Sequence, residues 1–82
     1  MKLFLISQDQ NNDYDTYDSA VVVAPDEETA RNMDPSNGQP MDRWECWWNT
    51  WCDDPNLVSV RYLGEAADGV TQGVVCASFN AA

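Results

Sequence analysis

The sequence predicts an α+β domain in which a four-stranded antiparallel sheet carries one or two short helices on one face. Two observations lead to this fold class. Four short apolar segments have the length and composition of strands, and the elements follow one another in the order β-β-α-α-β-β. A chain of 82 residues has room for one hydrophobic core, so residues 1–82 should form a single domain.

Apolar runs near the N-terminus predict the first two strands. One strand is expected over residues 2–8, around the run 3–6, and a second over 19–24, where three consecutive valines favour extended backbone. The stretch 9–18 between them is rich in Asp and Asn, which stabilise turns by bonding their own backbone. The two strands should therefore form a hairpin with an acidic loop at its tip.

Two helices are expected next. The first covers 25–33, with Asp26 as its N-cap, and Pro35 closes it because the residue before a proline is pushed out of helical geometry. The second covers 42–52, where the tryptophans fall at i, i+3, i+4 and i+7 and so share about one third of the helix circumference. These tryptophans are Trp44, Trp47, Trp48 and Trp51.

Two further strands complete the predicted sheet. Residues 57–63 alternate between apolar and polar side chains, as a half-buried strand does. Residues 73–80 form a last, largely apolar strand after a turn at 64–69. The order of the four strands in space does not follow from the sequence.

The charge of the chain is strongly unbalanced. It has 14 acidic and 4 basic residues, a formal net charge of −10, and no histidine. Binding to nucleic acid or to an anionic membrane depends on Lys and Arg, so neither is expected as a direct partner. A negative field instead attracts a protein with a basic surface and accelerates the encounter. The most prominent acidic residues form three groups: Asp9, Asp13, Asp15 and Asp18; Asp26, Glu27, Glu28 and Asp34; Asp53 and Asp54.

The composition gives no support for catalysis. Without histidine the chain lacks the most common general base, and no nucleophile–base pair can be recognised. Cys46 and Cys52 lack the second ligand pair that zinc requires, so no catalytic residue, metal or cofactor is predicted. Three cysteines, an odd number, indicate free thiols, and the N-terminal apolar run is too short for a signal peptide. A cytosolic protein is therefore expected.

A calcium loop is the alternative interpretation of the stretch 9–18. Oxygen ligands recur there at nearly every second position: Asp9, Asn11, Asp13, Asp15 and Asp18. Tyr14 stands where such a loop needs glycine, and Ala20 stands where it needs a glutamate ligand. A solvated turn is therefore the preferred interpretation, and a calcium-binding module is a third candidate function.

The tryptophan stripe also has two interpretations. An amphipathic helix lays its apolar face on the sheet, so some of the rings should belong to the core. Each indole covers roughly 150–250 Å², however, and a short helix on a small sheet is not expected to hide four of them. At least one ring should stay partly exposed and anchor a partner. A homodimer contact through Trp44 and Trp48 is the alternative use of this surface.

Parts of the sequence resemble small acidic proteins encoded by phages and prophages. The resemblance covers the stretch 3–31, in particular 12–24 (NDYDTYDSAVVVA) and 26–31 (DEETAR), and the ending 62–66 (YLGEA) with 73–81 (GVVCASFNA). Those proteins have no assigned activity, so the resemblance implies a setting, the cytosol of a bacterial host, and no catalytic residue. In size and charge the chain is also similar to anti-CRISPR and anti-restriction proteins, although no motif is shared.

The function predicted from the sequence is inhibition of a host defence protein by occlusion of its basic, nucleic-acid-binding surface. The carboxylates imitate nucleic-acid phosphates, and exposed tryptophans anchor the contact. The predicted partner-binding residues are Asp9, Asp13, Asp15, Asp18, Asp26, Glu27, Glu28, Trp44, Trp47, Trp48, Trp51, Asp53 and Asp54. The alternative is an assembly protein that self-associates through the tryptophan helix and inhibits nothing.

Overall fold

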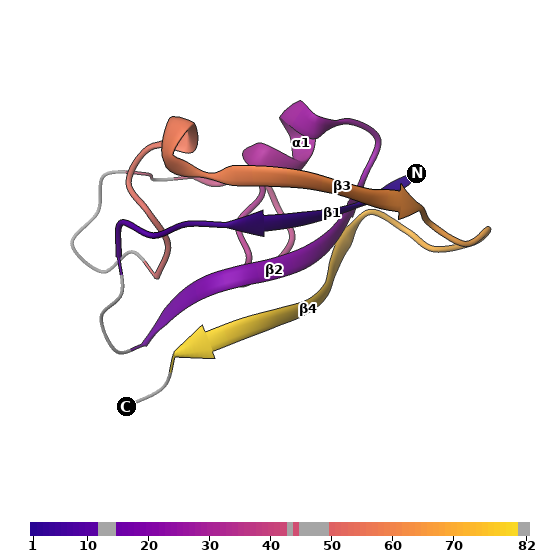
Figure 1. Ribbon diagram of the computed structural model, residues 1–82. Helices are drawn as coiled ribbons and strands as arrows, with labels where there is room; N and C mark the ends of the chain where they lie inside the picture. Colours follow the sequence, from indigo (N-terminus) through magenta and orange to yellow (C-terminus); the bar gives the residue numbers. More distant parts are fainter. Residues whose placement is uncertain (12–14, 43, 45–49, 81–82) are drawn as a thin grey trace.

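Four antiparallel strands form one sheet in the order β3-β1-β2-β4 (Figure 1). The computed structural model describes residues 1–11, 15–42, 44 and 50–80. Its elements are β1 (Lys2–Ser7), β2 (Thr16–Ala24), the α-helix α1 (Glu27–Arg31), the 3-10 turn η1 (Pro55–Leu57), β3 (Ser59–Glu65) and β4 (Gly73–Asn80). The predicted four-stranded antiparallel sheet is confirmed, with one α-helix among the described residues; a second is not confirmed.

β1 and β2 form the predicted hairpin, with Ile6 opposite Ala20. β2 begins at Thr16, three residues before the predicted start, so the end of the predicted loop is in fact strand. The reason is the pairing of β2 with β4, which places Tyr17 opposite Phe79. The ring centroids of these two aromatic residues lie 4.8 Å apart. A contact between distant parts of the chain therefore outweighs the turn propensity of the local sequence.

The hydrophobic core lies on one face of the sheet, which α1 and the segment that follows it cover (Figure 1). Side chains of β1 and β2 alternate between the two faces, so every second residue points into this core. The buried residues of the core are Phe4, Ile6, Ala20, Val22, Ala24, Ala30, Met33, Trp51, Cys52 and Val58. No described helix or strand packs on the opposite face, called the open face below.

α1 starts as predicted and ends early. The carboxylate of Asp26 accepts a hydrogen bond of 2.8 Å from the backbone N–H of Thr29, so Asp26 is the N-cap. The helix ends at Arg31 because Asn32 leaves helical geometry and Met33 then pairs with Pro40 in an isolated bridge. Ala30 and Met33 bury the apolar face of this turn, which tertiary contacts hold in place.

The Asp26 cap makes the stability of the fold depend on pH in a defined direction. The hydrogen bond from Thr29 lowers the pKa of Asp26 below its ordinary value of 3.8. A carboxyl with a lowered folded-state pKa stabilises the fold above its unfolded pKa, and this contribution is lost as the pH falls through the folded value. The Asp26→Asn variant does not titrate at this position. We therefore expect the difference in melting temperature between wild type and variant to be largest near neutral pH and to shrink below pH 3.8.

Circular dichroism melts between neutral and acidic pH measure that difference. Asp68→Asn is a matched control, because Asp68 is also exposed but lies in the connection between β3 and β4. A gap between wild type and Asp26→Asn that stays constant with pH would contradict the assignment.

The predicted tryptophan helix is not confirmed in its described part. Trp44, Thr50 and Trp51 lie in bends, while residues 45–49 lie outside the described residues. The backbone carbonyl of Thr50 accepts a hydrogen bond from Tyr17 in β2, and that of Trp51 accepts one from Asn11 in the loop before β2; both donors lie more than thirty residues earlier in the chain. Long-range contacts therefore determine the backbone at the end of this segment, and helical periodicity does not.

The second half of the sheet follows the prediction with shifted ends. Residue Leu57 belongs to η1 and precedes β3, which starts at Ser59. β3 continues through Gly64 and Glu65, which had been assigned to a turn, because both residues pair with the start of β1. β4 spans the predicted residues 73–80.

Candidate protein-binding surface

A buried glutamine shapes the acidic loop. Gln8 is 6% exposed. Its Nε2 donates hydrogen bonds to the carbonyls of Asn11 and Tyr17, at 2.7 and 2.9 Å, and its Oε1 accepts from the N–H groups of Gln10 and Asn11, at 2.9 and 2.8 Å. Both ends of one side chain are used, so the backbone of residues 9–11 is fixed. Gln8 is not among the predicted site residues, because a single polar side chain at the end of an apolar strand is no conspicuous signal of a structural role.

Three hydrogen bonds connect this loop to the segment 50–53. Tyr17 N–H donates to the carbonyl of Thr50 at 2.7 Å, and Asn11 Nδ2 donates to the carbonyl of Trp51 at 3.1 Å. Asp53 N–H donates to Gln10 Oε1 at 3.0 Å. The structure thus brings the first and third acidic groups to the same end of the sheet. We call this surface the acidic end and define it by Asp9, Asp15, Asp18, Asp53 and Asp54, all of them exposed.

Two acidic residues at this end also have structural roles. Asp54 caps η1 by accepting a hydrogen bond of 2.9 Å from Asn56 N–H. Asp15 has a positive φ of 63°, which aspartate tolerates better than most residues, and its N–H donates to the carbonyl of Asn80. Asp18 and Asp53 are exposed residues whose side chains the fold does not use in this way, so they are the better positions for testing a binding role.

The second acidic group lies separately, around α1. Asp26 caps the helix, Glu27 forms an ion pair of 3.3 Å with Arg31, and Asp34 accepts two hydrogen bonds from Ser36. Glu28 is exposed and accepts a long hydrogen bond of 3.5 Å from Asn32 Nδ2. Most carboxylates of this group therefore stabilise the helix and the turn after it. The structure does not join them to the acidic end.

The described cations do not belong to the acidic end. Arg31 turns inward, where its guanidinium donates to the carbonyls of Pro55 and Val58. Lys2 lies at the start of β1, and Arg61 lies on the open face opposite Leu5. Arg43 lies outside the described residues, as do Asp13 and Glu45. Within the described chain, the acidic end is therefore built without a lysine or arginine of its own.

Of the four tryptophans, the structure describes Trp44 and Trp51, and they differ in burial. Trp51 is 1% exposed and belongs to the core, so its predicted role as a surface anchor is wrong. The ring is buried because the contacts of residues 50–53 with the hairpin loop draw this segment onto the sheet. Trp44 is half-buried, packs against the core and keeps part of its surface accessible, as expected for at least one of the rings. Trp47 and Trp48 lie outside the described residues.

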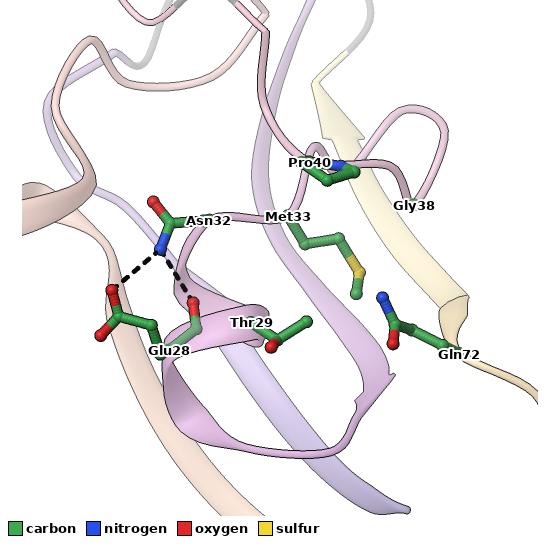
Figure 2. Close-up of a pocket in the computed structure, with 7 residues that line it drawn as sticks. All are labelled: Glu28, Thr29, Asn32, Met33, Gly38, Pro40 and Gln72. Atoms are coloured by element: carbon green, nitrogen blue, oxygen red, sulfur yellow. Dashed lines mark hydrogen bonds between the residues drawn. The ribbon is translucent and has the colours of Figure 1, made fainter.

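A small pocket lies beside α1 (Figure 2). Its volume is about 260 Å³, less than the roughly 300–1,000 Å³ of a typical ligand pocket. Apolar surface comes from Met33 and Pro40, whereas the carboxylate of Glu28 is turned toward Asn32, away from Met33 and Gln72 (Figure 2). Such a pocket can receive one side chain of a partner. The lining residues are Glu28, Thr29, Asn32, Met33, Gly38, Pro40 and Gln72.

The described residues offer little for other chemistry. They contain no group of three or more Cys, Asp or Glu side chains placed to hold a metal ion. Cys52 is buried and Cys76 is exposed; burial raises the pKa of the Cys52 thiol, which disfavours the reactive thiolate. In the same part of the chain, no helix combines the length and apolar character needed to cross a membrane.

No protein family, curated protein or solved structure matches the chain. The geometry and charge of the molecule are therefore what bear on its function.

Proposed function

We propose that the protein is a phage-encoded inhibitor that binds a basic, nucleic-acid-binding surface of a bacterial defence protein through its acidic end. One observation carries the proposal. Two acidic groups about forty residues apart in the chain, represented by Asp18 and Asp53, meet at one end of the sheet through the hydrogen bonds of the hairpin loop. A rigid cluster of exposed carboxylates can occupy positions that nucleic-acid phosphates take in the groove of the target.

Charged and aromatic residues contribute to the proposed binding in different ways. Asp18 and Asp53 are exposed and supply charge that steers the encounter. Trp44, with its accessible part, supplies apolar contact that prolongs the complex, because buried aromatic anchors mainly set dissociation. The pocket beside α1 accepts one side chain of the target. The target is a bacterial cytosolic protein, in keeping with the phage setting proposed for this chain.

The test starts with capture of the target. The immobilised protein is exposed to bacterial lysate, bound proteins are eluted with rising salt, and the eluate is analysed by mass spectrometry. We expect a nucleic-acid-binding protein that elutes as the salt rises, because exposed charge pairs are screened. The captured protein is then purified, and its binding to nucleic acid is titrated with the inhibitor. Recovery of no nucleic-acid-binding protein would contradict the proposal.

Charge reversal at the acidic end should abolish this inhibition. We expect the double variant Asp18→Lys/Asp53→Lys to inhibit at least tenfold less than wild type, since close charge pairs at an interface contribute on the order of 1.5 kcal/mol or more each. The measurement is the inhibitor concentration that halves nucleic-acid binding by the target.

A matched control separates position from net charge. The variant Glu65→Lys/Asp68→Lys also converts two exposed carboxylates and, like the test variant, moves the net charge from −10 to −6. Glu65 and Asp68 lie at the end of β3 and in the connection after it. Equal loss of inhibition in both variants would show that only net charge matters and would overturn the assignment to the acidic end.

A further inference from the structure

The loop after α1, residues 34–39, contains the single Asn-Gly pair of the sequence, Asn37–Gly38. In an unfolded chain, asparagine followed by glycine deamidates readily, because glycine has no side chain to hinder the attack of its backbone nitrogen on the asparagine side chain. Asn37 is exposed, so water reaches it. The loop therefore contains a reactive pair, and the geometry of the loop determines how fast this pair reacts.

Hydrogen bonds close the loop at its base and fix its first turn. Asp34 N–H donates to the carbonyl of Gln39 at 2.7 Å, and Met41 N–H donates to the carbonyl of Asn32 at the same distance. The carboxylate of Asp34 accepts hydrogen bonds from the N–H and the hydroxyl of Ser36, at 2.9 and 2.6 Å. The loop is therefore held by both its backbone and the side chain of Asp34.

The atoms that take part in deamidation are themselves bonded. Gly38 N–H donates to the carbonyl of Asp34 at 2.8 Å, and the Oδ1 of Asn37 accepts a hydrogen bond of 2.9 Å from Gln39 N–H. Deamidation requires the nitrogen of Gly38 to lose its proton and to approach the Cγ of Asn37. The bond to Asp34 holds this proton in place, so the loop has to open before the reaction can begin.

Gly38 also lies directly against the start of β4. Its φ of 76° is in the region that favours glycine, and a β-carbon at this position would lie 3.2 Å from the Cα of Gly73 and 3.3 Å from the backbone nitrogen of Val74. Figure 2 shows Gly38 in its loop with β4 beside it. Because the two backbones are this close, Gly38 can move toward β4 by less than the size of one carbon atom.

We propose that Asn37 is a modification site, at which the chain converts to isoaspartate when the loop opens, and that the product can no longer seat the loop on β4. In the first step, the nitrogen of Gly38 forms a bond to the Cγ of Asn37. The bond from Cγ to Nδ2 breaks, and Nδ2 leaves as ammonia with the proton of Gly38.

Water then opens the five-membered succinimide ring. Cleavage between the nitrogen of Gly38 and the backbone carbonyl carbon of Asn37 gives isoaspartate, whereas cleavage at Cγ gives ordinary aspartate. Either product has one carboxylate more than before, so the net charge changes from −10 to −11. No reactant other than water is consumed.

The two products should differ in structure. In isoaspartate the chain runs through Cβ and Cγ, which adds one atom to the backbone before Gly38. This longer backbone has no room on the side of β4, so the loop has to lift away, and the pocket that Gly38 lines together with Gln72 changes shape. Aspartate leaves the backbone unchanged and allows the loop to close. The inference does not rest on the proposed inhibition.

A second Asn-Gly pair in the same protein tests the control by the loop. Asp68→Asn places such a pair at 68–69, in an exposed turn where a β-carbon at Gly69 would meet no atom within 4 Å. The variant is incubated at mildly alkaline pH, folded or in urea, and both sites are followed by peptide mapping with mass spectrometry. In the folded protein Asn37 should react at least about tenfold more slowly than the new pair, and in urea at a similar rate.

Two results would overturn the proposal. Equal rates at the two sites of the folded protein would show that the loop does not control the reaction. Absence of a product at Asn37 in urea would show that this asparagine is not a modification site.

Variants of Asp34 test which bonds hold the loop closed. Asp34→Ala removes the acceptor of both Ser36 bonds and should accelerate the reaction at Asn37 severalfold. Asp34→Asn removes the same charge but keeps an acceptor oxygen, so its rate should stay nearer to wild type; the new asparagine cannot react in this way, because Pro35 has no N–H. Melting curves check that both variants are folded. Equal rates in the two variants would contradict control by these hydrogen bonds.

Amide hydrogen exchange tests the effect of the product on the loop. Protein enriched in isoaspartate is separated from aged samples by ion exchange, and Asn37→Asp is the matched control, with the same net charge of −11 and a normal backbone. In the isoaspartyl protein the amides of Asp34 and Gly38 should exchange much faster than in Asn37→Asp, while amides of β1 and β2 remain protected. Equal protection of Gly38 in both proteins would contradict release of the loop.

Discussion

Replacement of Trp51 by alanine should unfold a large part of the population at moderate temperature. Trp51 is 1% exposed and is among the largest fully buried side chains of the described core. Truncation of a buried tryptophan costs about 3–5 kcal/mol, through lost apolar burial and the cavity left behind. A domain of this size has a total stability of roughly 4–12 kcal/mol, so the loss is a large fraction of it. The melting temperature should fall by roughly 15–30 °C.

Urea denaturation followed by far-ultraviolet circular dichroism measures this loss. Trp44→Ala is the matched control, because Trp44 is half-buried and packs only at the margin of the core. Its truncation should cost about 1–2 kcal/mol, in proportion to the apolar area that it covers. Equal destabilisation by the two substitutions would contradict the difference in burial. Trp51→Phe retains part of the volume and should fall between wild type and Trp51→Ala.

Trp44 and Trp51 also show why the spacing of the tryptophans was a poor guide to the backbone conformation. Spacing at i, i+3, i+4 and i+7 indicates a helix when local contacts decide the backbone. At Thr50 and Trp51 the backbone is instead bonded to a loop far away in the sequence. A sequence pattern contains no information about such a partner. Helical periodicity correctly indicated that some of these rings are buried, but it could not show that Trp51 would be one of them.

The strands were easier to predict because each one is marked by its own residues. Consecutive valines and short apolar runs favour extended backbone wherever the strand lies in the sheet, and β4 matches its predicted residues 73–80. The ends of the strands depend on partners. β2 starts early because β4 pairs with Tyr17, and β3 ends late because Gly64 and Glu65 pair with β1. The open face could not be foreseen, since it is defined only once the strand order is known.

The acidic residues can be identified from the sequence, but which of them lie close together in space cannot. The three groups along the chain become two surfaces, because the hairpin loop bonds to the segment that contains Asp53. The caps at Asp26 and Asp54 follow from local sequence rules, and only the first of them had been predicted. The bond from Asp53 goes to Gln10, in the loop that the side chain of Gln8 braces, and Gln8 has no conspicuous signal in the sequence.

Gln8 should therefore be the second most sensitive position among those discussed. In Gln8→Leu the side chain keeps a similar size but loses all four hydrogen bonds, so two carbonyls and two N–H groups lose their partner. An unsatisfied buried polar group costs about 1–3 kcal/mol, and because water can reach part of this site we expect a loss of about 2–4 kcal/mol in total. Gln10→Leu is the control, since the exposed Gln10 side chain accepts one bond, from Asp53 N–H, and its loss should cost under about 1 kcal/mol.

Amide hydrogen exchange shows which part of the structure Gln8→Leu loosens and by how much. In Gln8→Leu the amides of Gln10 and Asn11, which donate to Gln8 Oε1, should exchange much faster at temperatures where amides of β1 and β2 remain protected. Loosening of this loop also displaces Gln10, which bonds Asp53 N–H, so the variant should inhibit less while its net charge stays at −10. Unchanged protection of both amides would show that the loop keeps its shape without Gln8. The acidic end would then owe its geometry to the bonds with residues 50–53 alone.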